Sequence, residues 1–164
     1  MKKIIAVLTV LGIAFALCSC TAEPKTDIFE FCKRINRADK TAKIDGADFF
    51  YDGENEYAYS VYVGAEECLL ALITDGEHCV EALRLTTVKG VNQIDPDAFY
   101  GFCITLCSVL TGSEKDETAE LFGKNGFTAQ SVGFNGESLR ADCKSFTFFV
   151  VTNEEIISFY CTLN

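Results

Sequence analysis

The fold is decided by the stretch CLLALITDGEHCVEALRLTTV, which runs from Cys68 to Val88. Two apolar runs of strand length flank the Asp-Gly pair at 75–76, and Asp-Gly between such runs is a strong signal for a β-hairpin. The stretch therefore predicts two antiparallel strands, 68–74 and 79–88.

The segments before this hairpin predict a second one. Residues 48–52 and 56–63 flank turn residues, and the side chains of 56–63 alternate between two sides of a strand. Ahead of both segments, Thr26-Asp27 can cap a helix whose apolar residues recur at helical spacing as far as Ala38. The first half of the chain is therefore expected to be a helix followed by a four-strand meander.

The second half repeats this order. Asp95 before Pro96 predicts the start of a helix that Gly112 can end, and a shorter helix is expected from Ser113 to Phe122. Strands are expected at 128–134, 138–142, 145–152 and 156–163, with turns at Asn135-Gly136 and Asn153-Glu154.

The recurring order indicates a single α+β domain, 27–164, with an internal repeat of 27–90 and 95–164. Identity between the halves is low, so divergence of a duplicated unit and coincidence are both open. Two such halves can join edge to edge into one continuous antiparallel sheet with the helices on one face. This order is similar to the tandem helix-and-meander halves of beta-lactamase inhibitory proteins. The similarity includes no shared motif, so it gives inhibitor function little weight.

Residues 1–19 have the composition of a signal peptide. Lys2 and Lys3 precede an apolar run from Ile4 to Leu17, and small residues follow. That run of fourteen residues is shorter than the roughly twenty that a membrane-spanning helix needs. The segment is therefore expected to be removed rather than kept as an anchor.

The residues LCSC, which end at Cys20, resemble the lipobox of bacterial lipoproteins. The resemblance implies cleavage before Cys20, lipid attachment to its thiol, and a location on the extracytoplasmic face of the cell membrane. Residues 20–26 would form the lipidated tether. Cys18 departs from the usual alanine or serine, although its side chain is also small. The alternative is an ordinary signal peptide cut nearby, which would release a soluble secreted protein.

Charge limits the classes of partner. The chain has 14 basic and 24 acidic residues, and its formal charge of −10 becomes −12 once Lys2 and Lys3 leave with the leader. Nucleic acid is repelled by this balance and is not expected as a partner. Anionic lipid headgroups are repelled too, so the fold is expected to stand away from the membrane and to depend on its acyl chains for attachment. Recruitment of a basic partner or of cations is the alternative to a role in solubility alone.

Seven cysteines would accompany lipidated Cys20 in the mature chain: Cys32, Cys68, Cys79, Cys103, Cys107, Cys143 and Cys161. An odd number leaves at least one without a disulfide partner. Cysteines outside the cytoplasm normally indicate disulfides. Several of these lie in apolar runs, however, which favours small core residues with mostly reduced thiols.

Catalytic and metal-binding patterns are scarce. Cys103 and Cys107 share a helix face and could offer two thiolates to a metal, but a second ligand pair is missing, so core packing is predicted. His78 is the only histidine and lies in a tight turn, where an exposed position is expected. The sequence therefore assigns no catalytic, cofactor-binding or metal residue, and Cys20 is its one predicted modification site.

These observations favour a surface-anchored lipoprotein that acts as a binding or protein-interaction module, with a protein or peptide partner, rather than an enzyme. The tyrosines motivate this prediction, since their rings offer rigid amphipathic contact area. They are Tyr51, Tyr57, Tyr59, Tyr62 and Tyr100. Packing in the core or on the sheet also fits most of them. An envelope enzyme or enzyme accessory, and a purely structural lipoprotein, are the alternatives.

Overall fold

The computed structural model describes residues 25–44, 49–53, 55–88, 94–133, 138–153 and 155–164. Its helices are α2 (Ile28–Ala38), α3 (Pro96–Thr111), α4 (Lys115–Lys124) and the 3-10 helix η2 (Ala129–Gly133). Its strands are β1 (Phe49–Gly53), β2 (Glu56–Val63), β3 (Glu66–Thr74), β4 (Val80–Val88), β5 (Ser138–Asp142), β6 (Phe146–Thr152) and β7 (Ile156–Leu163). The predicted leader, Cys20 and the Asn135-Gly136 turn lie outside the described residues.

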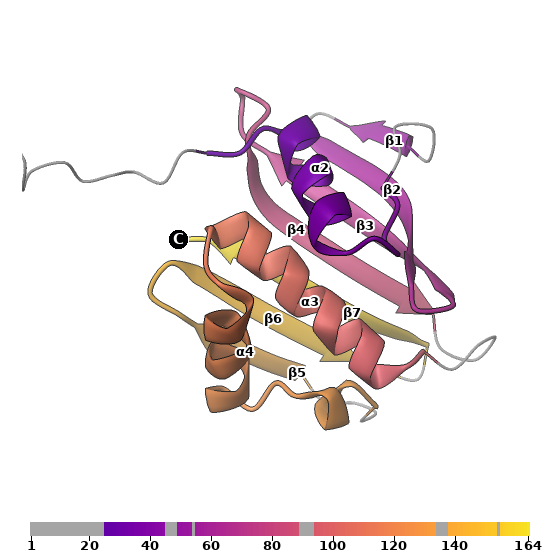
Figure 1. The fold of residues 1–164 in the computed structure, drawn as a ribbon, viewed down its shortest axis with the longest axis vertical. Coiled ribbons are helices and arrows are strands. Elements are labelled where there is room, and N and C mark those ends of the chain that lie inside the picture. Colours follow the sequence, from indigo (N-terminus) through magenta and orange to yellow (C-terminus); the bar gives the residue numbers. More distant parts are fainter. Residues whose placement is uncertain (1–24, 45–48, 54, 89–93, 134–137, 154) are drawn as a thin grey trace, which may run out of the picture.

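All seven strands form one antiparallel sheet in the order β1-β2-β3-β4-β7-β6-β5. The two meanders join where β4 pairs with β7, from Ala82↔Thr162 to Val88↔Ile156. Helices α2, α3 and α4 lie on the same face of this sheet (Figure 1). The predicted α+β class, with two meanders joined into one sheet under a layer of helices, is confirmed.

Local chemistry explains where α2 and α3 begin. The Asp27 carboxylate accepts hydrogen bonds from the backbone N–H groups of Phe29 and Glu30, which satisfies two donors at the start of α2. Asp95 does the same for α3, which has a proline in its first turn and ends at Gly112 with φ of 73°. Helix α3 contacts β4, β7 and β2, so it covers the junction between the two meanders.

The strand predicted at 128–134 is wrong. Residues Ala129–Gly133 form the 3-10 helix η2 instead, and three strands of the second meander are found among the described residues. Ser131 provides the physical reason, because its hydroxyl donates to the Thr128 carbonyl at 2.7 Å and accepts from the Thr128 N–H at 3.0 Å. These local bonds satisfy backbone groups that a strand would have paired with a neighbour.

Helix α4 also differs in its bounds. It begins at Lys115 after Glu114, which makes no side-chain cap bond, rather than with a cap at Ser113. It continues past Phe122 to Lys124. Each end of the helix is therefore shifted by two residues from its predicted position. Shifts of this size are common, because helix ends fray and the sequence defines them poorly.

The core lies between the helices and the sheet. In the C-terminal half it is a cluster of phenylalanines centred on Phe122, whose ring centroid lies 5.1 Å from that of Phe127, 4.7 Å from Phe148 and 5.7 Å from Phe159. All four side chains are fully buried. No helix in the described parts of the chain is both long and apolar enough to cross a bilayer.

Candidate functional site

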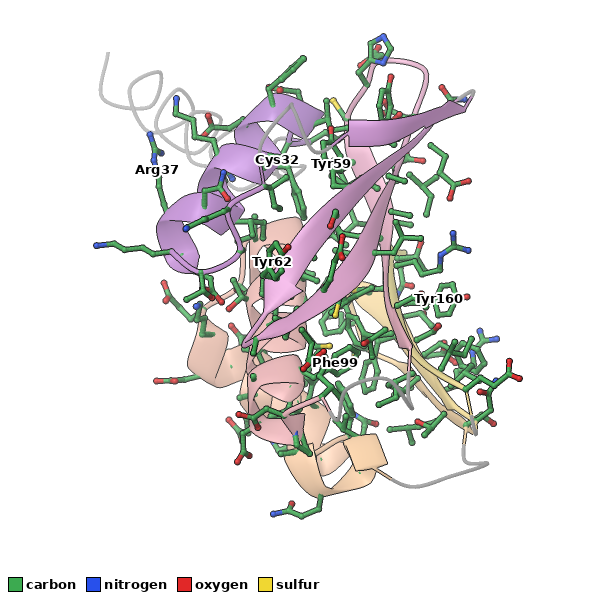
Figure 2. All side chains as sticks on the ribbon, turned by 90° about the vertical axis from the view of Figure 1, so that its right-hand side faces the viewer. Cys32, Arg37, Tyr59, Tyr62, Phe99 and Tyr160 are labelled. Atoms are coloured by element: carbon green, nitrogen blue, oxygen red, sulfur yellow. The ribbon has the colours of Figure 1, made fainter. Side chains whose placement is uncertain are left out.

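One face of the sheet has no described helix against it, and we call it the open face. On β2, buried Val61 points toward the helices, so Tyr62 points to the other side and is 52% exposed. On β6, Phe148 is fully buried, whereas its neighbour Phe149 is 36% exposed. Figure 2 shows Tyr160 on the side of the sheet away from α2 and α3.

The strand registers align six residues of the open face in one row across β2, β3, β4, β7, β6 and β5. We call this the central row: Ala58, Ala71, Arg84, Tyr160, Phe149 and Arg140. The two alanines are buried. The large side chains therefore occupy the four strands from β4 to β5, where two arginines flank two aromatic rings.

Arg84 is held from two sides. Its Nη2 lies 3.2 Å from Glu56 Oε1, and its Cζ lies 6.0 Å from the centroid of the Tyr160 ring. The Tyr160 ring in turn packs against Phe149, with centroids 5.9 Å apart. Contacts between a cation and a ring, and between two rings, favour defined orientations. This part of the open face is therefore organised before any partner binds.

Arg140 closes the other end of the central row. Its Nη2 lies 3.3 Å from Asp142 Oδ1, and the Thr147 hydroxyl donates to the same carboxylate oxygen at 2.9 Å. The hydrogen bond from Thr147 and the one from Arg140 hold the pKa of Asp142 below its ordinary value. The Arg140 side chain stays 68% exposed, so its guanidinium is accessible to a partner.

The central row offers contact area and positive charge. The six residues of the central row include no histidine, cysteine, serine or carboxylate that could act as a base or nucleophile. Tyr160 is partly exposed and Phe149 is 36% exposed. Aromatic rings and guanidinium groups are enriched at the centres of protein interfaces. A guanidinium is also suited to bidentate recognition of a carboxylate.

The two thiols on α3 considered as metal ligands, for which core packing is predicted, are buried in the core. Cys103 and Cys107 are fully buried, and Cys107 Sγ lies 3.5 Å from Cys161 Sγ of β7 rather than forming a ligand set with Cys103. The contact with Cys161, together with burial, raises the pKa of the Cys107 thiol well above its usual range. Burial likewise raises the pKa of Cys103. Across the described ranges, no three His, Cys, Asp or Glu side chains gather to hold a metal.

His78 lies exposed in the turn between β3 and β4, in a left-handed backbone conformation with φ of 62°. Its Nδ1 is 3.0 Å from the Tyr57 hydroxyl, a contact that the sequence did not indicate. The adjacent Cys79 thiol lies 3.9 Å from the Glu77 carbonyl oxygen. Burial raises the pKa of Cys79, which makes the thiolate less available.

Two hollows on the helix side are small. The larger measures about 260 Å³ and is lined by Lys25, Arg34 and Leu110 among others, while the smaller measures about 100 Å³ beside Phe127 and Leu139. Sites for drug-sized ligands usually occupy about 300–1,000 Å³. These hollows therefore offer less support for a ligand site than the open face does.

The tyrosines proposed from sequence do not lie together. Tyr62 is on the open face, and Tyr59 is buried beneath α2. Tyr57 contacts the turn between β3 and β4, and Tyr100 packs within α3 against the phenylalanine cluster. The side chain of Tyr51 lies outside the described residues.

The sequence reasoning missed Tyr160, Phe149, Arg84 and Arg140. The alternation of side chains along β6 gave a usable signal, since Phe149 points to the opposite side of the strand from its buried neighbours. The alignment of all four required the register across β4, β7, β6 and β5, which no local pattern provides. Comparison with known protein families, with curated proteins and with solved structures finds no match to this chain.

Proposed function

We propose that this chain is a membrane-anchored lipoprotein whose open face binds a protein partner. The observation that carries the binding proposal is the central row, in which Arg84 and Arg140 flank Tyr160 and Phe149. A complementary partner surface presents carboxylates toward the arginines and apolar side chains toward the rings.

The dimensions of the open face support a macromolecular partner. The seven strands have five to nine residues each and average about 24 Å in length, so at a spacing of about 4.8 Å they give a face of roughly 800 Å². A standard protein interface buries about 800 Å² on each partner. The open face is therefore large enough for one side of such an interface, whereas a small molecule would find no enclosing walls there.

The anchor is proposed from the LCSC residues that end at Cys20. Lipidation would leave a tether of a few residues between the acyl chains and Lys25, the first described residue. The partner would then be met at the membrane, on the extracytoplasmic face.

Affinity capture from a membrane extract of the native host tests the binding proposal. The bait is the protein purified from the same membranes, as wild type, Arg84→Ala or Tyr160→Ala. We expect a stoichiometric partner on the wild type, and each substitution should weaken binding about thirtyfold because hot-spot truncations cost about 2 kcal/mol or more.

Lys124→Ala provides the matched control, because Lys124 is an exposed basic residue of α4 on the helix side. Its capture should equal that of the wild type. Circular dichroism of each variant verifies that the fold is retained. Capture that is insensitive to both open-face substitutions, with the folds intact, would remove the open face from the proposal.

Replacing Cys20 tests the anchor. Cys20→Ala removes the thiol that would accept the lipid, so incorporation of labelled fatty acid should disappear. Cys18→Ala is the control, since it retains Cys20 and restores a more usual small residue. Equal labelling of the wild type and Cys20→Ala would contradict lipidation at this position.

A further inference from the structure

The outermost ridge of α2 combines an exposed aromatic ring with basic side chains. Phe29, Lys33 and Arg37 recur at i, i+4 and i+8, on the side of α2 opposite the buried Ile28 and Ile35. Phe29 is 84% exposed, and the side chains of Lys33 and Arg37 are 60% and 65% exposed. We call these three residues the α2 ridge. A phenylalanine at such a position gains almost no packing within the domain.

Charge is distributed very unevenly along the chain. Residues 25–43 carry six basic and three acidic side chains, a net charge of +3, whereas residues 44–164 carry six basic and twenty acidic ones, a net charge of −14. The overall acidity that argues against contact with anionic lipids is therefore not a property of α2 and its flanks. Local charge decides contact, because exposed charges more than about 8–10 Å apart are largely screened at physiological ionic strength.

Ion pairs on α2 leave this excess in place. Glu30 is the acidic group shared by Lys33, Arg34 and Arg37, at 3.8, 3.3 and 3.9 Å. One carboxylate among three cations leaves a net charge of +2 on this surface. The positively charged surface of α2 ends at the first turn of α4, which carries acidic residues. That turn lies beside the end of α2, since Lys115 donates a hydrogen bond to the carbonyl of Ala38.

The position of α2 next to the proposed anchor points to the membrane as the partner of this surface. Four residues lie between Cys20 and Lys25, and the five steps along the chain span at most about 18 Å when fully extended. Lys25 is itself fixed to the domain through Asp75 at 2.7 Å and Glu81 at 3.1 Å. A lipid attached at Cys20 would therefore keep the start of α2 within one tether length of the bilayer.

We propose that the α2 ridge lies on an anionic phospholipid surface, with the Phe29 ring among the headgroups and Lys33 and Arg37 beside lipid phosphates. Aromatic and basic side chains on one helix face are the combination that binds the membrane interface. The inference deepens the proposed function, and its proximity argument rests on the anchor at Cys20.

This placement also orients the binding surface. In Figure 2, Arg37 points away from the sheet on the helix side, while Tyr160 lies on the opposite side of the molecule. With the α2 ridge on the bilayer, the open face turns away from the membrane and toward the extracytoplasmic space. The same domain can then hold the membrane with one surface and a protein partner with the other.

The absence of tryptophan from the chain allows a direct test. Phe29→Trp introduces a single fluorescent reporter at a highly exposed position, where the larger ring is tolerated. The protein extracted from host membranes is reconstituted into vesicles of phosphatidylglycerol and phosphatidylcholine. We expect a blue-shifted emission and strong quenching by lipids brominated near the headgroup. Phe149→Trp is the matched control on the open face, and its emission should be insensitive to the brominated lipids.

Two further measurements test whether the negative charge of the lipid and the basic side chains of the α2 ridge contribute to binding. Vesicles of phosphatidylcholine alone should reduce the quenching of Phe29→Trp. So should the added changes Lys33→Gln and Arg37→Gln. Each should lower the equilibrium constant for the surface-bound state of the α2 ridge by about fivefold, the ratio equivalent to about 1 kcal/mol per basic residue at an anionic surface. Equal quenching in neutral vesicles would overturn the assignment to anionic lipid.

The possible failures are distinguishable. Protein that floats with the vesicles without quenching at position 29 would overturn the α2 ridge proposal and leave the anchor standing. Protein that does not float at all would overturn both. A blue shift that requires host proteins instead of lipid would assign the ridge to a protein partner, and that result also contradicts the proposal.

Discussion

On β6, Phe148 is fully buried beneath α4 while Phe149, the next residue, lies on the open face of the same sheet and is 36% exposed. The ring of Phe148 lies 4.7 Å from that of Phe122, whereas the ring of Phe149 meets Tyr160 at 5.9 Å. The same residue type therefore serves the core on one side and a candidate binding surface on the other. Strand parity, rather than hydrophobicity, separates these roles.

The largest expected difference between the two faces is in stability. Phe122→Ala should lower the free energy of unfolding by about 3–5 kcal/mol, because it leaves a cavity at the centre of the phenylalanine cluster. Phe149→Ala, on the open face, should cost about 1 kcal/mol or less. Urea unfolding followed by circular dichroism measures both. Similar losses at the two positions would contradict the assignment of the faces.

The next contrast uses neighbouring residues of β7. Cys161 points into the core and is 1% exposed, while Thr162 is exposed on the other side. Cys161→Ala should cost about 1 kcal/mol. Cys161→Ser should cost more, by roughly 1–3 kcal/mol, because it buries a hydroxyl in an apolar site.

Thr162→Ala and Thr162→Ser should differ little from the wild type in the same urea titrations. A chelator should leave every midpoint unchanged if the thiols are packing residues, as predicted for Cys103 and Cys107. A large drop in the wild-type midpoint on chelation would indicate a structural metal instead.

A smaller effect is expected at alkaline pH. Burial raises the pKa of the Cys68 thiol from 9.0 to about 11, and Cys68 points to the helix-covered face. A raised folded-state pKa means that stability is complete below about pH 9 and falls as the pH rises toward 11, because the unfolded thiol ionises first. Urea midpoints should therefore decline across this window. Cys68→Ala should flatten the decline, and an identical slope in both proteins would refute this cause.

Part of this architecture follows from sequence patterns because local chemistry specifies it. Asp27 and Asp95 cap the helices that their sequence context predicts, and the Asp75-Gly76 signal marks the β3–β4 hairpin. The strand predicted at 128–134 was wrong because Ser131 bonds locally to Thr128, and apolar periodicity does not reveal such a bond.

The candidate site was less accessible to sequence reasoning. The central row exists only when β4, β7, β6 and β5 adopt their mutual registers, and β4 and β7 are far apart in the chain. The contact between Cys107 and Cys161 likewise depends on how α3 packs on β7. By contrast, the basic character of residues 25–43 is visible in the sequence, but the net charge of the whole chain conceals it.

The central claim is that the open face meets a protein while the α2 side meets the membrane. Photo-crosslinking in intact cells of the native host tests it most directly, with benzoylphenylalanine in place of Phe149 in one protein and of Phe29 in another. Both replaced residues are exposed aromatic residues, so the two positions are chemically matched. We predict a discrete protein adduct from position 149, and no protein adduct from position 29. A protein adduct from position 29 with none from position 149 would contradict the account.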